Sequence, residues 1–207
     1  MNAPSNQIMM PVGPHHDLLT EKIAIDCEMM RSNIGQVLGR VSVINYNSQT
    51  IFDTFVCYPQ PIHVTNTSEQ YSGIRWSDID PQNGAQPFLQ VQAQLVEIFR
   101  GRIVIGHDIE KDLRVIRMDL QTHTLRLEGV YQIETPVKLD MKTRDTQKYT
   151  GYSQYAIGPH GPSLKTLALE VLGRPIKMGR ISSVEDAVAT MAVYRNAEAG
   201  IEQEQAK

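Results

Sequence analysis

The chain has 207 residues, of which 41% are hydrophobic, and a formal net charge of −3 from 20 basic and 23 acidic residues. This length accommodates one domain with a full core, and the charge gives no global basic signal for a nucleic-acid partner. Two cysteines, Cys27 and Cys57, offer no disulfide framework, favour a reducing compartment, and are both expected to be buried.

The first half of the chain predicts a leader followed by closely spaced strands. Residues 1–20 are polar and interrupted by proline and glycine, so we expect a flexible leader. No apolar run reaches membrane-spanning length, and the N-terminus lacks a basic segment followed by an apolar one, so neither a membrane nor secretion is indicated. Short runs joined by turns then predict an antiparallel meander, with strands at Lys22–Cys27, Val37–Tyr46 and Ile51–Cys57.

The second half of the chain predicts helices alternating with strands. Residues 58–87 form a long polar loop, and loops of this length usually have a function or contain short helices. Apolar residues at helical spacing follow, with stripes at Phe88, Leu95 and Phe99; Ile109, Leu113, Ile116 and Leu120; Leu164, Leu167, Val171 and Leu172; and Val184, Val188 and Met191. Two further strands are predicted at Arg102–Ile105 and Val137–Asp140.

These elements predict an α/β domain over residues 21–199, with a mixed five-stranded central sheet flanked by helices. The last helix is expected to begin near Ser182, because Ser182 and Glu185 match the spacing of a capping box. Residues 200–207 are expected to form a fraying tail.

Paired carboxylates in the first strand indicate a metal site. Asp26 and Glu28 are two residues apart, so their side chains share one face of the strand. Carboxylates beside an apolar strand are costly unless they bind a ligand or lie at the sheet edge. Oxygen ligands suit Mg²⁺, and two such ions can stabilise both oxygens of a phosphoryl displacement. A lone pair of this spacing also occurs often by chance.

Two later aspartates strengthen this prediction. Asp112 lies one turn into the helix that follows Gly106-His107, and ligands of open α/β sheets bind where strands lead into helices. Asp186 lies in the first turn of the last helix, where the helix dipole favours an acid. Taken alone, Asp112 could be a surface acid and Asp186 a simple cap.

Seven short strings in order along the chain carry a resemblance to a known family. They are IAIDCEM (Ile23–Met29), GRVSVIN (Gly39–Asn45), YSGI (Tyr71–Ile74), GHDIEKDL (Gly106–Leu113), TRDTQKY (Thr143–Tyr149), PSLKTLA (Pro162–Ala168) and SSVEDA (Ser182–Ala187). Together they resemble the DEDD superfamily of 3′→5′ exonucleases, in the branch of RNA exonuclease 4 and the interferon-stimulated gene 20 nuclease. The resemblance implies an RNase H-like fold.

The resemblance also implies a two-metal site that holds Mg²⁺ or Mn²⁺. Asp26 would bridge both ions, Glu28 and Asp186 would join it on the ion that activates water, and Asp112 would serve the ion near the leaving 3′-oxygen, mostly through water. Met29 and Met30 would line the pocket for the terminal nucleotide, with a core position as the alternative. His107 is a further candidate substrate contact, with a structural place at the helix start as the alternative.

One part of the family's site is missing. The histidine-bearing subclass has its general base five residues before the last aspartate, where this chain has Ile181. The tyrosine-bearing subclass has its base one residue later, where this chain has Ser182. Arg180 remains charged and is a poor base, while His160, in the loop before the PSLK helix, could reach the site from elsewhere.

Two functions follow from these residues. The first is a metal-dependent exonuclease, attenuated by the loss of its base, that acts on free 3′ ends of RNA or single-stranded DNA. The second is a silenced exonuclease-like domain that binds nucleic acid or a protein partner. Four retained ligands favour the enzyme, and Ile181 favours the binder. The family implies the nucleus or the cytoplasm as the location.

Overall fold

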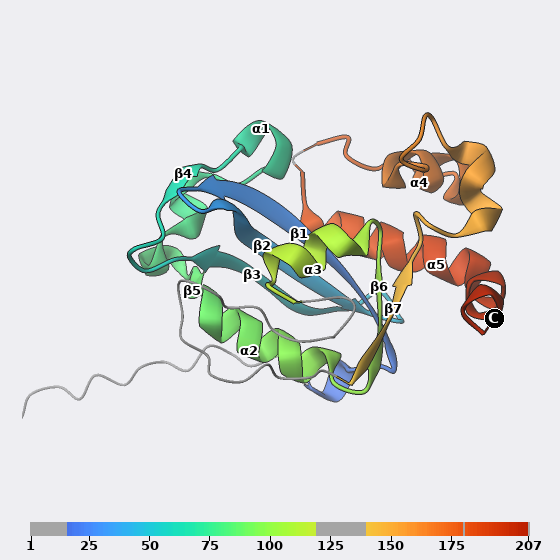
Figure 1. Cartoon of the computed structure of the whole chain (residues 1–207), viewed down its shortest axis with the longest axis horizontal. Coiled ribbons are helices and arrows are strands. Elements are labelled where there is room, and N and C mark those ends of the chain that lie inside the picture. Colours follow the sequence, from blue (N-terminus) through green and yellow to red (C-terminus); the bar gives the residue numbers. More distant parts are fainter. Residues whose placement is uncertain (1–15, 119–139, 180, 207) are drawn as a thin grey trace, which may run out of the picture.

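A mixed β-sheet forms the centre of the molecule, in a computed structural model that describes residues 16–118, 140–179 and 181–206 (Figure 1). Its strand order is β5-β3-β2-β1-β6-β7, and β4 pairs with the end of β1. The long strands of the antiparallel meander are β1 (Lys22–Ser32), β2 (Gly35–Asn45) and β3 (Thr50–Cys57). Parallel to β1 run β6 (Arg102–Gly106) and β7 (Met141–Asp145). The mixed central sheet predicted from the sequence is thus confirmed, but it has seven strands rather than five, because the short strands β4 and β5 are added.

Helices cover both faces of this sheet (Figure 1). Helices α2 (Phe88–Phe99) and α3 (Ile109–Val115) pack on the face to which Ile23, Ile25 and Cys27 of β1 point. Helix α5 (Ser183–Gln205) packs on the opposite face, where Met191 and Tyr194 contact Ala24. Helix α4 (Leu164–Leu172) packs in turn against α5. Successive residues of β1 therefore alternate between the two layers, as a strand requires.

The long loop after β3 contains short regular elements, as its length predicts. They are β4 (Val64–Asn66), α1 (Glu69–Ser72), single 3₁₀ turns at Trp76–Ile79 and Pro81–Asn83, and β5 (Gln86–Pro87). Further 3₁₀ turns occur at His16–Leu18 and Thr150–Tyr155. Leu18 and Leu19 pack against the main core, so the end of the expected leader belongs to the fold, while residues 1–15 lie outside the described residues.

The fifth strand was predicted at the wrong place. Strand β7 consists of Met141–Asp145, whereas Asp140 is in no strand and residues 137–139 lie outside the described residues. The polar segment MKTRD forms the strand because its backbone pairs in register with β6, from Arg102 to Gly106. An edge strand needs fewer apolar side chains than a central one, which hides it from a search for apolar runs. The stripe predicted through Leu120 likewise overextends α3, which ends at Val115; Leu120 lies outside the described residues.

The structure of the C-terminal helix differs from two further predictions, one for its start and one for its end. Ser182 is its N-cap residue but its side chain makes no capping hydrogen bond, so the expected capping box is absent. The boundary expected at residue 200 falls inside α5, where Ile201 is buried. The carboxylate of Glu202 pairs with Arg144 of β7 at 2.5 Å, and Glu204 accepts from Thr150. These tertiary contacts hold in place a segment whose composition alone resembles a tail.

Within the described residues, no helix combines the length and the apolar character needed to cross a membrane.

Candidate active site

Three carboxylates meet at the carboxyl half of β1, on the face that α5 covers. Asp26 and Glu28 of β1 and Asp186 of α5 each offer an oxygen that lies within 4.8 Å of the others. Glu28 and Asp186 are buried and Asp26 is half-buried. Cys27 points to the opposite face and belongs to the main core. The alternation predicted for these strand residues is confirmed, and Cys57 is buried as predicted too.

Asp186 reaches this group because the first turn of α5 is anchored to the meander. Ser183 is fully buried and its Oγ lies 2.6 Å from Oγ of Ser42 in β2. Ser42 also contacts Oδ1 of Asp53 at 2.8 Å, and Asp53 accepts two hydrogen bonds from Arg40. This chain of polar contacts ties the helix start to β2 and β3, and so fixes the position of Asp186 three residues later.

The fourth carboxylate, Asp112, reaches β1 through a gap in the sheet. Strand β6 pairs with β1 only as far as Ala24, opposite Ile105. Beyond that point the backbone N–H of Cys27 donates to Oδ1 of Asp112 at 3.1 Å. The start of α3 is held in turn by Asp145 at the end of β7, whose Oδ1 accepts from the N–H of Asp108 at 2.9 Å. The sheet thus brings Asp112 close to Asp26, although Asp112 is not one of the three carboxylates that lie within 4.8 Å of one another.

The four carboxylates affect one another strongly. Burial, followed by the negative charges of Asp112, Asp186 and Glu28, raises the pKa of Asp26 well above its usual range. Burial and the charge of Asp186 raise the pKa of Glu28 to about 7. Burial also raises the pKa values of Asp112 and Asp186. Oδ1 of Asp186 is buried and has no hydrogen-bond partner among the described residues. A crowded acidic group with an unpaired buried oxygen has the donor set that a hard divalent cation requires.

The ammonium group of Lys177 also lies in this site. Nζ of Lys177 is 2.5 Å from Oδ2 of Asp186, and its charge also acts on Asp26 and Glu28. No motif in the sequence marks this residue, because it lies nine positions before Asp186 in an irregular segment. Only the fold of that segment brings the ammonium group to the carboxylates.

The two methionines after Glu28 have different environments. The pairing of β1 with β2 shifts between Glu28 and Met29, opposite Gly39. A Cβ on Gly39 would lie 2.6 Å from Cγ of Met30 and 2.4 Å from Ile74, so only glycine allows this close approach. Met30 is 1% exposed and packs in the small core with Ile74. The burial of Met30 therefore favours the core alternative over the predicted substrate contact, while Met29 is half-buried.

His107 also has a structural environment. Its Nδ1 lies 3.0 Å from Oγ1 of Thr146, and Thr146 donates to the carbonyl of Gly106. Burial lowers the pKa of His107 to about 4, so the imidazole is neutral near pH 7. These contacts join the end of β6 to the segment after β7, and they favour the structural alternative over the predicted substrate contact.

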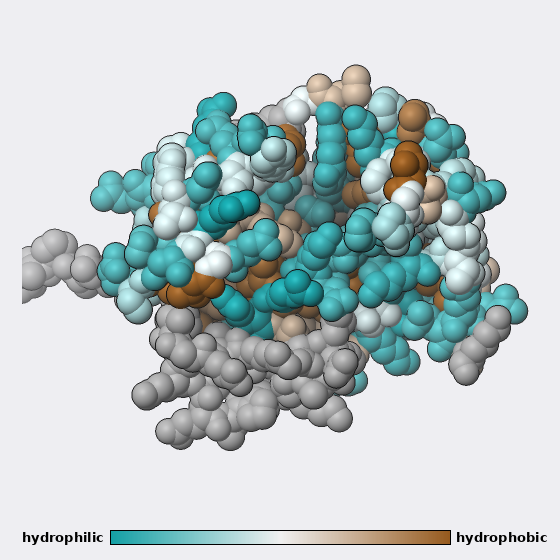
Figure 2. Space-filling model, turned by 45° about the horizontal axis from the view of Figure 1, so that its top comes forward, coloured by the Kyte–Doolittle hydropathy of each residue, from teal (hydrophilic) through white to brown (hydrophobic). Residues whose placement is uncertain are grey.

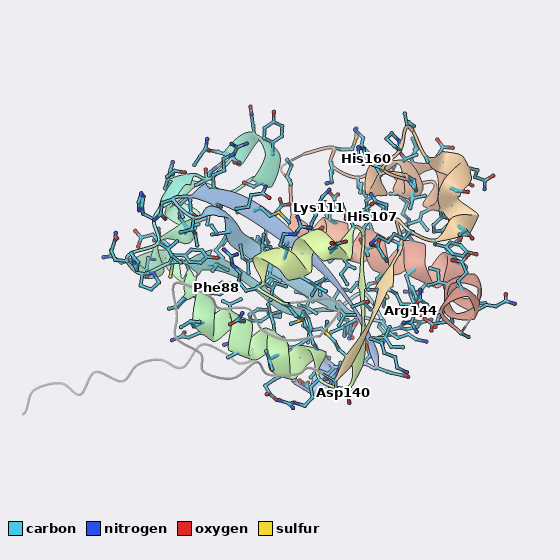
Figure 3. All side chains as sticks on the ribbon, viewed as in Figure 1. Phe88, His107, Lys111, Asp140, Arg144 and His160 are labelled. Atoms are coloured by element: carbon cyan, nitrogen blue, oxygen red, sulfur yellow. The ribbon has the colours of Figure 1, made fainter. Side chains whose placement is uncertain are left out.

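The position of the missing base lies directly before α5. Ile181 is half-buried, and a Cβ on Gly73 would lie 2.6 Å from its carbonyl oxygen. Gly73 also has a φ of 66°, so glycine in the YSGI string allows this approach. His160 is exposed in the loop before α4 (Figure 3). Within the part of the chain that the structure describes, no hydrogen bond joins His160 to the carboxylates.

Acidic pH is expected to stabilise the metal-free protein. The pKa of Glu28 is about 7 in the fold and 4.5 in the unfolded chain. Protonation of Glu28 therefore stabilises the fold fully below pH 4.5, and this stabilisation is lost as the pH rises through 7. This loss is on the order of 3 kcal/mol, which corresponds to roughly 6–12 °C in a domain of this size. Thermal unfolding at pH 5 and pH 8 should show the higher midpoint at pH 5. Millimolar Mn²⁺ should remove most of this difference, because it stabilises the native state at pH 8.

Two sequence relatives of the chain carry the same name, RNA exonuclease 4. The chain is 34% identical over 189 residues to RNA exonuclease 4 of Neurospora crassa, covering 90% of this chain and 41% of that protein. It is 36% identical over 176 residues to RNA exonuclease 4 of Gibberella zeae, covering 84% of this chain and 48% of that protein. The chain thus spans about half or less of the length of these relatives. No protein-family model matches the chain.

Solved structures with the same fold come from nucleases. The nuclease-containing catalytic unit of Neurospora crassa Pan2 superposes with a TM-score of 0.63 at 21% identity, over 96% of this chain and 29% of that one. A Saccharomyces cerevisiae Pan2 exonuclease module in complex with AAGGAA RNA gives 0.63 at 22% identity, over 92% and 31% of the two chains. The α/β fold with a central sheet flanked by helices, RNase H-like as the resemblance implies, is therefore confirmed.

Proposed function

We propose that the chain is a metal-dependent 3′→5′ exonuclease of the DEDD type, which hydrolyses phosphodiester bonds at the 3′ ends of RNA or single-stranded DNA. The observation that carries the proposal is the meeting of Asp26, Glu28 and Asp186 within 4.8 Å, with Asp112 beside Asp26. The names of its sequence relatives support the same activity.

The acidic group fits divalent cations such as Mg²⁺ or Mn²⁺. Asp26, Glu28 and Asp186 would hold one ion together, and Asp26 and Asp112 would hold a second. Bound ions would supply activation of a water molecule and stabilisation of negative charge on the phosphate. The fit rests on the raised pKa values of Asp26 and Glu28 and on the unpaired buried oxygen of Asp186. Such carboxylates gain most when a cation relieves their mutual repulsion.

Residues of this chain set how fast the reaction can be. Ile181 has no group that accepts a proton, and the neutral His107 is already bonded to Thr146. Loss of a positioned general base costs about 10²–10⁴-fold, so we expect slow turnover. Half-buried Met29, next to Glu28, is the remaining candidate for contact with the terminal base, and a methionine there supplies an apolar surface on which the base can stack.

The alternative function is a silenced domain that binds nucleic acid or a protein partner without cutting. Ile181 is the observation that favours it. Figure 2 shows a mainly hydrophilic face on which apolar residues stand separately rather than in one broad patch. Because a silenced domain has no chemical need for four ligands, we rank the enzyme first.

The two buried free thiols and the resemblance support a location in the nucleus or the cytoplasm.

A comparison of linear and circular substrates tests the proposed function. With Mn²⁺ or Mg²⁺, a single-stranded oligonucleotide with a free 3′-hydroxyl should be shortened stepwise to mononucleotides. A circular oligonucleotide of the same sequence should stay intact, because it has no end. A time course with 3′-labelled and 5′-labelled strands, in DNA and in RNA, measures direction and preference. Equal cutting of circle and line would exclude an exonuclease, and binding without cutting over long incubation would favour the silenced domain.

A further inference from the structure

We propose that Lys177 takes the place of a divalent cation beside Asp186 in the metal-free protein, and that metal binding displaces it. This inference rests on the proposed function, since it concerns the same carboxylates. It adds a residue that sets how tightly the site binds metal.

The contacts of Lys177 place its charge where a cation would lie. Its ammonium group contacts Oδ2 of Asp186, the oxygen next to the unpaired Oδ1. Its charge also acts on Asp26 and Glu28, so it contacts one member of the group that could hold an ion and acts electrostatically on the other two. A lysine ammonium is a compact point charge, which makes it a suitable stand-in for a metal ion among crowded carboxylates.

The backbone around Lys177 is shaped to deliver this side chain. Ile176 is buried against α4 and α5, whereas Met178 is 79% exposed. Between them Lys177 has a φ of 61°, a left-handed conformation that non-glycine residues rarely adopt. Its N–H donates to Oε2 of Glu185 at 3.0 Å. Strained backbone of this kind persists where surrounding contacts enforce it, and here the first turn of α5 supplies two of them, at Glu185 and Asp186.

The same side chain can leave the site without unfolding the loop. The Lys177 side chain is 37% exposed, whereas that of Asp186 is 4% exposed. Four methylene groups allow the ammonium to swing into water while the anchors at Ile176 and Glu185 remain. Oδ2 of Asp186 then becomes available together with Oδ1. Metal binding must therefore replace an existing charge-assisted hydrogen bond, which weakens the apparent metal affinity.

Calorimetric titration of Mn²⁺ into metal-stripped protein tests this proposal without measuring catalysis. Lys177→Gln should bind Mn²⁺ about tenfold more tightly than wild type, because it removes one charge-assisted contact that is partly screened by solvent. Its metal-free thermal midpoint should be lower by about 2–4 °C, because three carboxylates lose their counter-ion. Lys177→Asn is a second neutral variant that tolerates the left-handed backbone, and it should show both effects.

Lys111→Gln is the matched control. Lys111 lies on α3 (Figure 3) and pairs with Asp108, which is outside the three-carboxylate group, so its loss should change neither quantity comparably. Equal Mn²⁺ affinity in wild type and both Lys177 variants would overturn the counter-ion proposal and leave the metal site intact. Weaker binding in the variants would also overturn it. Absence of Mn²⁺ binding in every protein would instead refute the proposed metal site itself.

Discussion

Asp26→Asn is expected to lower the rate of metal-dependent hydrolysis by at least about 10³-fold. Asp26 is the carboxylate that both Asp112 and the Glu28–Asp186 pair approach, so its replacement weakens both positions at which an ion could bind. Metal ions contribute several kcal/mol of charge stabilisation in such reactions, and each 1.36 kcal/mol corresponds to a tenfold change in rate. Single-turnover rates on a 3′-labelled oligonucleotide, together with Mn²⁺ affinity by calorimetry, measure the effect.

The same substitution should have the opposite effect on metal-free stability. One negative charge leaves a group of four that repel one another, so the thermal midpoint of metal-free Asp26→Asn should rise above that of wild type. Asp140→Asn makes the same chemical change at an exposed residue before β7, far from His107 and Lys111 (Figure 3), and should alter neither rate nor midpoint. A nuclease rate that survives Asp26→Asn unchanged would place the chemistry elsewhere in the molecule.

Ile181→His is expected to raise the rate of hydrolysis by about 10²–10⁴-fold. Residue 181 precedes the N-cap residue of the helix that carries Asp186, and the backbone of Gly73 packs closely against its carbonyl group. A neutral imidazole near pH 7 has a basicity suited to accepting a proton from an attacking water. The rate of the variant should rise with pH through about 6.5, the usual pKa of histidine, and this pH profile separates a base from a merely polar residue.

Ile181→Asn is the control for polarity, because its amide does not accept a proton at these pH values. It should leave the rate near that of wild type. If Ile181→His binds Mn²⁺ as wild type does but hydrolyses no faster, the site lacks more than its base. Placement of the substrate would then be at fault, and the silenced domain would become the better description of the protein.

The periodicity of apolar residues and the order of the predicted strands and helices were sufficient to predict most of the fold. The meander, helices α2 and α4 and the buried strand β6 each have a local signal, because apolar residues recur with the period of the element that buries them. For the acidic residues, local geometry predicts only that Asp26 and Glu28 share a strand face. Asp186 joins them through a tertiary contact, because Ser183 at the start of α5 lies against Ser42 of β2.

Other features depended on contacts between distant parts of the chain. Strand β7 exists because a polar segment pairs with β6, and the end of α5 is fixed by Arg144, 58 residues before Glu202. The N–H that holds Asp112 belongs to Cys27, 85 residues earlier. Such pairings stabilise segments whose own composition is neutral or unfavourable, so propensity and pattern do not reveal them.

The sequence by itself therefore predicted the layers of this protein from short-range periodicity, and its candidate acidic ligands from residue chemistry together with the resemblance to a known family. Only the tertiary structure decided which methionine is buried, that His107 is engaged by Thr146, and that Lys177 enters the acidic group. The physical reason is that an irregular loop has no repeating pattern. The direction of each side chain in it is set by the backbone conformation that the surrounding elements impose.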